Sequence, residues 1–244
     1  MKKISIAILA LVFTNGIFSQ EVETKSFRFG LKIAPSVNWM KPDNTKIFEN
    51  GGSNIGFNWG LVTEFALRYL FSVSTGLELN YESGKINFTE PAYYGITPSY
   101  EFLETKKNET SGEYYPEGFQ ISEDAAVELR KRKYASTYVT LPIAIKMKTK
   151  EIGYMTYFGE FGVNVAFRTK TKVTDEGNIT AANSAQFDLT DMNYDKDMQP
   201  LRTQLLVGFG TEYKIAGSTA IFGSIHYNLG FTNSVKKDSK HLLD

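Results

Sequence analysis

Two polar residues near the carboxyl end of the sequence have side chains that could perform catalysis. Ser224 and His226 stand two positions apart in the segment AIFGSIHYNLGF (residues 220–231), and a serine beside a histidine is the smallest unit for nucleophilic hydrolysis. Residues two apart on a strand point to the same side. A histidine that faces inward beside asparagine and glycine is typical of a polar network. We therefore predict no catalytic residue and no enzymatic activity.

A second segment has the side chains of a cation site. The sequence DMNYDKD (residues 191–197) places acidic and amide groups at alternate positions, as at the start of a calcium loop. Lys196 replaces the usual glycine, and Arg202 stands where the bidentate glutamate would be. Two histidines and no cysteine also disfavour a zinc site. We predict no metal and no cofactor, and a solvated acidic loop at residues 191–197.

A larger set of charged side chains lies on one phase of the alternating segments described below. Each member stands among small residues, on the face opposite the bulky ones, so we expect them to share one interior. Opposite charges in a low-dielectric interior should pair, because unpaired burial is costly. The sequence predicts a structural ion-pair network that plugs the lumen of a barrel, with a narrow ion gate as the alternative. The predicted lumen polar network is Lys32, Glu64, Glu78, Glu160, Arg202, Glu212 and His226.

The elements that position these residues have the period of β-strands. In NIGFNWGLVTEFALRY (residues 54–69), Ile, Phe, Trp and Leu alternate with Asn, Gly, Asn and Gly. A solvated strand face usually carries Thr and Lys rather than repeated glycine. The bulky face is therefore predicted to meet lipid, as in transmembrane β-barrels. The same phase recurs in residues 27–39, 71–81, 138–147, 157–168, 201–213 and 220–231.

The connections between these strands alternate in length. Tight turns are expected at residues 68–71, 149–153 and 216–219, whereas residues 40–53, 89–133 and 173–199 form long polar links. Short turns at one end and long loops at the other indicate an up-and-down meander. Two local irregularities are expected. Residues 122–132, SEDAAVELRKR, carry a possible N-cap at Ser122 and predict a short helix, and Pro142 predicts a bulge or local break in its strand.

The fold class is therefore an all-β, up-and-down antiparallel transmembrane β-barrel, with eight strands when complete and seven visible. Bacterial single-chain barrels have an even strand number, and residues 232–244 read as the start of a fourth long loop. An open barrel would leave unpaired edges in hydrocarbon. We expect a truncated chain whose C-terminal strand is missing; closure by the N-terminal segment or by another chain is the alternative.

The amino terminus predicts export. Met1-Lys2-Lys3 precedes about ten apolar residues, too few to span a membrane, and then a polar stretch. We predict a signal peptide at residues 1–19, cleaved before Gln20, and a barrel domain at residues 20–244. No later segment approaches the ~20 apolar residues of a transmembrane helix. The formal charge of zero gives no reason to expect a nucleic-acid partner.

One soluble architecture competes with this interpretation. A periplasmic lipocalin-like barrel would turn the apolar side chains inward and bind a small ligand. Its outer face would then carry many glycines and almost no lysine or threonine. Its interior would have to hold a Phe, Trp, Tyr or Leu at nearly every inward position, which is more bulk than an eight-stranded barrel admits.

The segments FGLKIAPSVN, YVTLPIAIKMK, YFGEFGVNVAF and LLVGFGTEY resemble the PorT-like outer-membrane β-barrel family of Gram-negative envelopes. The resemblance covers nearly all of the chain after the signal peptide, but its motifs are patterns without a catalytic signature. It implies an eight-stranded barrel in the outer membrane. Name-giving members of that family take part in assembling a protein-secretion apparatus, a role that the resemblance alone does not transfer.

The expected partners are the lipid bilayer and a protein that would bind the loop of residues 89–133. That loop is rich in tyrosine, which combines contact area with a polar tip. The basic run at residues 130–133 lies near the outer rim, where it could contact phosphates of outer-leaflet lipid. The sequence thus predicts a non-enzymatic outer-membrane barrel with a structural or interaction role; secretion-system assembly or adhesion is an alternative.

Overall fold

The computed structural model describes most of the chain after the predicted signal peptide. The signal peptide predicted at residues 1–19 and the predicted helix cap Ser122 lie outside the described residues. The described residues are 27–42, 45–68, 70–97, 102–103, 105–107, 114–116, 125–181, 189–217 and 219–236.

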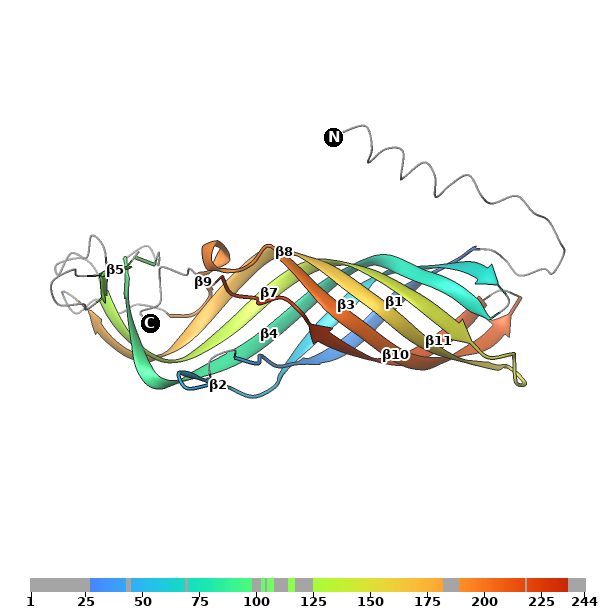
Figure 1. Ribbon diagram of the computed structural model, residues 1–244, viewed down its shortest axis with the longest axis horizontal. Coiled ribbons are helices and arrows are strands. Elements are labelled where there is room, and N and C mark those ends of the chain that lie inside the picture. The colour runs from blue at the N-terminus through green and yellow to red at the C-terminus, as the bar shows by residue number, and fades with distance from the viewer. Residues whose placement is uncertain are drawn as a thin grey trace, which may run out of the picture.

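Seven long strands form one antiparallel sheet in which each strand pairs with the next along the chain, as predicted (Figure 1). Two of the tight turns contain glycine with positive φ, at Gly153 (+66°) and Gly217 (+55°), a conformation that other residues rarely adopt. The strands, in sheet order, are β1 (Phe27–Asn38), β3 (Asn54–Arg68), β4 (Phe71–Ile96), β7 (Ala125–Lys148), β8 (Met155–Ala181), β10 (Leu201–Ala216) and β11 (Thr219–Gly230).

Short elements lie beside the long strands. β2 (Phe48–Asn50) pairs with β4, and β9 (Met192–Asn193) pairs with β8. A 3₁₀ turn, η2 (Asp195–Asp197), follows β9. β5 (Thr105–Lys107) and β6 (Tyr114–Pro116) form a separate two-stranded sheet.

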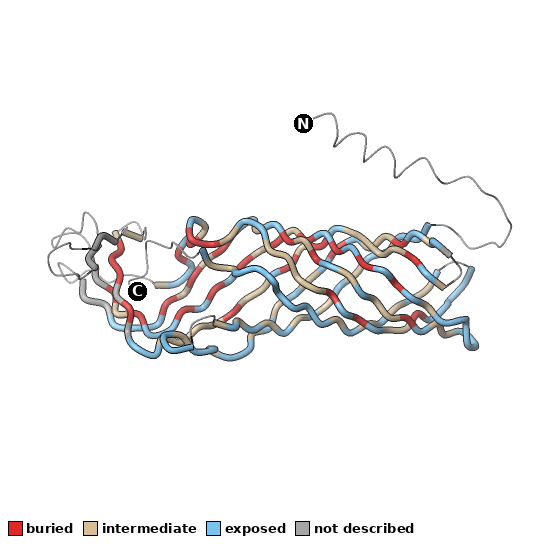
Figure 2. The backbone as a smooth tube through the Cα atoms, in the orientation of Figure 1, coloured by how far each residue is buried: buried red, intermediate tan, exposed pale blue. Residues whose placement is uncertain are grey.

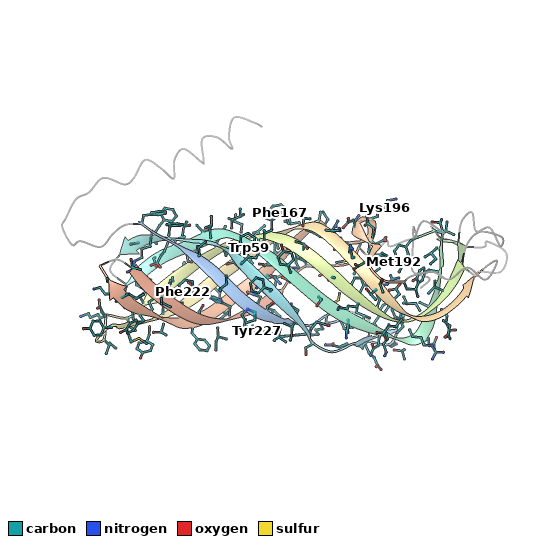
Figure 3. All side chains as sticks on the ribbon, turned by 180° about the vertical axis from the view of Figure 1, so that it is seen from behind. Trp59, Phe167, Met192, Lys196, Phe222 and Tyr227 are labelled. Carbon is teal, nitrogen blue, oxygen red and sulfur yellow. The ribbon has the colours of Figure 1, made fainter. Side chains whose placement is uncertain are left out.

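The bulky face of the sheet points outward and the polar face inward. Figure 2 shows buried and exposed positions alternating along the strands, and Figure 3 shows Phe167 projecting from the outer surface. On β3, Trp59 and Leu61 are 45 % and 46 % exposed, whereas the carboxylate-bearing Glu64 is only 9 % exposed. This is the arrangement of a lipid-facing barrel and the reverse of the lipocalin arrangement.

Three neighbouring strands continue far beyond the others. β4, β7 and β8 contain 26, 24 and 27 residues, whereas β1 and β11 contain 12 each. Their distal parts, residues 82–96, 125–138 and 168–181, are here called the extension, and they run to one end of the molecule in Figure 1. The extension has its own buried apolar core, which includes Tyr94, Leu129 and Val173, and Tyr194 from the segment after β9 packs into it.

The predicted helix at residues 122–132 is wrong in its described part. Residues from Ala125 onward belong to β7, which pairs with β4 on one side and β8 on the other. Val127 and Leu129 are fully buried at alternate positions, so two flanking ladders and a packed core outweigh a local capping signal. The links predicted at residues 89–133 and 173–199 are correspondingly shorter, because β4 extends to Ile96 and β8 to Ala181.

Pro142 interrupts a ladder without shifting it. β4 and β7 pair in one register on both sides of Pro142, at Thr75–Ile143 and at Glu78–Thr140. The two residue pairs between these positions are missing. A proline has no N–H to donate, so this local loss is expected. The bulge alternative is wrong at this site; the register shifts of β7 occur near Lys131 and Tyr138 instead.

The sheet curls into a barrel wall with a seam. Within the described residues, β1 and β11 end the sheet and do not pair with each other. Trp39, just after β1, and Tyr227 of β11 face each other near the seam with ring centroids 6.3 Å apart. The N-terminal segment that could close the seam lies outside the described residues. Among the described residues, no helix is both long and apolar enough to cross a membrane.

Candidate functional site

The ion-pair network inside the barrel is centred on Lys146 of β7. Its Nζ atom lies 2.6 Å from Glu212 Oε1, 3.3 Å from Glu64 Oε2 and 3.9 Å from Glu160 Oε1. The same ammonium group stands 3.8 Å from the centre of the Phe158 ring. Lys146 is 6 % exposed, so three carboxylates and a ring replace the water that its charge would otherwise bind.

Two further cations share the same carboxylates. Lys148 Nζ lies 2.5 Å from Glu64 Oε1 and 3.0 Å from Glu212 Oε1. Arg28 of β1 donates to Glu212 Oε2 at 2.8 Å, reaching across the lumen to a strand with which β1 does not pair. Glu212 therefore contacts three cations, which makes it the carboxylate with the most partners in this network.

The remaining pairs lie around this centre. Lys32 of β1 donates to Glu78 of β4 at 2.8 Å. His226 Nε2 lies 2.8 Å from Glu160 Oε2. Arg202 Nη2 lies 2.7 Å from both carboxylate oxygens of Glu82. Its guanidinium carbon stands 4.1 Å from the centre of the Tyr138 ring.

The structure places all seven predicted network residues on the inward face. It divides them among several pairs. Two pairs, Lys32–Glu78 and His226–Glu160, lie within the predicted set. Four further partners were not in that set: Lys146, Lys148, Arg28 and Glu82. Each of these partners stands at an inward position of its strand, so the alternation pattern alone could have identified it. Which inward residues meet depends on how the sheet curls, and the alternation does not contain that information.

A glycine explains why the inward face needs small residues. Gly208 of β10 pairs with His226 of β11. A Cβ atom at position 208 would lie 2.1 Å from His226 Cδ2, which is closer than real contacts allow. The missing side chain therefore leaves the space in which the imidazole reaches Glu160.

The other motifs singled out from the sequence are engaged in ion pairs or hydrogen bonds. His226 uses Nε2 on Glu160 rather than on Ser224. In residues 191–197, Asp191 lies 3.0 Å from Lys172, and Asp195 forms an ion pair with Arg168. Across the part of the chain that the structure describes, no group of three or more His, Cys, Asp or Glu side chains could hold a metal ion.

A second polar site lies in the core of the extension. Arg132 of β7 is fully buried and forms two hydrogen bonds with Asp175 of β8, at 2.7 and 2.6 Å. Its guanidinium carbon lies 4.8 Å from the centre of the Tyr194 ring and 5.2 Å from that of Tyr94. Tyr94 of β4 also donates its hydroxyl hydrogen to Asp175. This cluster joins β4, β7 and β8 with the segment after β9.

Burial sets the protonation states in that cluster. Burial raises the pKa of Tyr94 and of Tyr134, and the nearby carboxylate of Asp175 raises both further. Asp175 also holds the pKa of Arg132 above its usual value, against the opposing effect of burial. The tyrosines are neutral and the arginine is charged at every physiological pH, so the cluster keeps one charge state and holds its strands together.

A cavity of about 2250 Å³ follows the lumen and opens along the seam between β1 and β11. Inward side chains such as Lys32, Glu78 and His226 line it together with outward-phase residues of the two seam strands, such as Ile33 and Ile225. The ion pairs inside the lumen join strands that do not all neighbour one another, as Arg28 of β1 and Glu212 of β10 show. The interior is therefore polar, charge-paired and partly filled by side chains.

The comparisons with known proteins agree with this architecture. A family model described as "Outer membrane protein beta-barrel domain" matches residues 18–236, which is most of the chain. No curated protein matches the sequence significantly. No solved structure does so either.

Proposed function

Because the chain belongs to the outer membrane protein beta-barrel domain family, we propose that it is a non-enzymatic outer-membrane barrel. In this proposal the lumen polar network stabilises the barrel, and the extension presents binding loops outside the cell. The single observation that carries the proposal is the opposition of the two sheet faces. Phe161 is 55 % exposed on the outer face, whereas Lys146 is 6 % exposed inside. Bulky apolar side chains exposed on the outer face of a curled sheet have one favourable neighbour, which is hydrocarbon.

The lumen network supports a structural role better than conduction. Glu212, Glu64 and Glu160 are compensated by cations at 2.5–3.9 Å, so the lumen holds fixed pairs rather than a row of like charges. Rings of one charge sign are what selects ions in a pore. A narrow ion channel is the weaker candidate for this reason.

The extension supports a role in binding a protein outside the cell. A core of its own and the buried Arg132–Asp175 pair make it a rigid support for the connecting segments at its tip. Rigid scaffolds that carry loops are the usual arrangement of binding surfaces. The partner would bind the link between β4 and β7, within the predicted loop of residues 89–133. The PorT-like resemblance makes assembly of a secretion apparatus the second candidate for this binding role.

The absence of cysteine from the sequence offers a clean test of orientation. Single-cysteine variants at Lys133 in the extension, at Lys150 in a tight turn and at Phe161 on the outer face would be labelled with a membrane-impermeant maleimide. In intact cells the proposal expects labelling of the Lys133→Cys variant alone. The Lys150→Cys variant should label only after the outer membrane is permeabilised, and the Phe161→Cys variant only with a lipophilic reagent. Labelling of the Lys150→Cys variant in intact cells would contradict the orientation.

A further inference from the structure

A group of lysines lies on the outward face of the extension, next to the apolar band. The outer lysine patch is defined as Lys85 of β4, Lys131 and Lys133 of β7, and Lys170 and Lys172 of β8. Lys131, Lys133 and Lys170 are exposed, and Lys85 and Lys172 are half-buried. Their neighbours along the strands, such as Arg132 and Thr171, are buried inside the extension. The patch therefore belongs to the same outward face as the bulky residues of the barrel.

The register of the sheet brings like charges together in this patch. Lys85 is the direct cross-strand partner of Lys133, and the residue beyond Lys133 in the same row is Thr174. Two like charges directly opposite each other on one face destabilise an antiparallel pair. A structure that keeps this pair gains if an anion lies between the two ammonium groups.

The acidic residues near the patch compensate only part of it. Lys172 pairs with Asp191 at 3.0 Å, and Lys131 pairs with Glu176 at 3.4 Å. Glu49 of β2 lies in the same row as Lys131, one strand beyond Asn87. Within the described residues, Lys85, Lys133 and Lys170 take part in no ion pair. These three cations lie closer along their strands to the apolar band than Glu176 and Glu49 do.

The height of the patch corresponds to a lipid headgroup layer. Lys85 follows the exposed Tyr81 by four residues, and Lys170 follows the exposed Phe167 by three. At about 3.3 Å per residue these steps measure roughly 10–13 Å along inclined strands. The headgroup regions extend several ångströms beyond the hydrocarbon on each side. A lysine stem can also lie along apolar surface while its ammonium group reaches the polar layer.

We infer that the outer lysine patch binds the phosphate of a phosphorylated glycolipid in the outer leaflet. The inference rests on the proposed function, since it needs the extension to stand on the outer side of the membrane. A lipid fits the patch better than a free anion, because the patch continues the apolar band on one face. The acyl chains would contact side chains such as Leu79 and Phe167 while the phosphate lies between Lys85 and Lys133. A free phosphate would gain only the second contact.

The test is a binding titration of the full-length protein in detergent micelles. The probe is fluorescent lipid A, and its dephosphorylated form is the comparison ligand. Folding and insertion are checked first by heat-modifiable migration on a gel. The Lys85→Gln/Lys133→Gln double variant should raise the apparent Kd for lipid A about tenfold or more. The matched control, Lys150→Gln/Lys214→Gln, removes two cations at the tight-turn end and should bind like the unmodified chain.

Four outcomes would overturn the inference. Dephosphorylated lipid A could bind as tightly as lipid A, the double variant could bind normally, or the control could lose as much affinity. Full displacement of lipid A by an equal concentration of inorganic phosphate would identify a free-anion site instead. If the double variant fails to fold, Lys170→Gln alone must still weaken binding severalfold. A chain that does not migrate as a folded barrel at all contradicts the proposed function, whereas a folded barrel without phosphate preference contradicts only this inference.

Discussion

The Nζ atom of Lys146 lies 2.6 Å from Oε1 of Glu212, although the two residues are 66 positions apart and stand on strands that do not pair. β8 separates β7 from β10 in the sheet, so this contact exists only because the sheet curls. Glu212 also contacts Lys148 and Arg28. Curling of the sheet therefore brings the buried charges into contact with their partners.

Removing the charge of Glu212 should destabilise the barrel. The Glu212→Gln variant leaves three cations with less compensation, and breaking a buried pair by removing one partner costs about 3–5 kcal/mol. Urea unfolding of the refolded protein should show a loss of that size. Glu151→Gln, which breaks an exposed pair with Lys214, is the control and should cost less than about 1 kcal/mol. Equal losses in the two variants would contradict a network role for Glu212.

Removing charge from Glu64 or Glu160 should affect stability more than conductance. Each carboxylate lies next to Lys146, so Glu64→Gln and Glu160→Gln each leave this buried ammonium group with one carboxylate fewer. We expect lower stability in urea and unchanged currents in planar bilayers. The opposite result, altered ion selectivity at normal stability, would favour the narrow-channel alternative.

An arginine on the outer face should be tolerated or rejected according to its depth. Leu61 lies near the middle of the apolar band of β3, whereas Ala135 is exposed on the outward face of the extension. Leu61→Arg should cost about 2–4 kcal/mol, the value for a cation near the bilayer midplane, and Ala135→Arg about 0–1 kcal/mol. The measurement is folding into lipid vesicles at graded urea concentrations. Equal costs at the two positions would indicate that the band does not meet lipid.

Breaking the Arg132–Asp175 pair should unfold the extension locally while the barrel stays folded. Arg132→Met leaves Asp175 buried without its ion partner, at a cost of about 3–5 kcal/mol. Hydrogen exchange of residues 125–137 should accelerate, while heat-modifiable migration of the barrel is retained. Arg130→Met, in an exposed pair with Glu128, should leave exchange unchanged. Loss of barrel migration in Arg132→Met would show that the two cores are not separable.

Alkaline pH should destabilise the extension. The pKa of Tyr94 and of Tyr134 is raised in the folded state, so the unfolded chain releases these protons first. Their contribution to stability is complete below the unfolded tyrosine pKa of about 10 and is lost as the pH rises above it. Absorbance titration at alkaline pH should show a late group of tyrosines. The Tyr94→Phe/Tyr134→Phe variant should lack two members of that group; an unaltered titration would contradict the assigned burial.

The alternation in the sequence predicted the strands and which face of each points inward. It did not predict the contacts across the lumen. Alternation identified both the outward phase of Trp59 and the inward phase of Glu64, because the period of a strand is local. The pairing of Lys146 with Glu212 depends on strand tilt and curl, which no local pattern encodes. The extension was missed for a related reason. Residues 122–132 have helix-like capping and charge signals, and the flanking strands and the buried Arg132 make the described part, from Ala125 on, a strand.

The central claim is that Trp59, Leu61 and Phe161 face lipid, and fractionation of the producing cell tests it most directly. Membranes would be washed with carbonate, and the full-length protein would be run on a gel with and without boiling. A lipid-facing barrel remains with the outer membrane and migrates faster when it is not boiled. Release of the protein into the soluble fraction would show that these side chains do not face lipid.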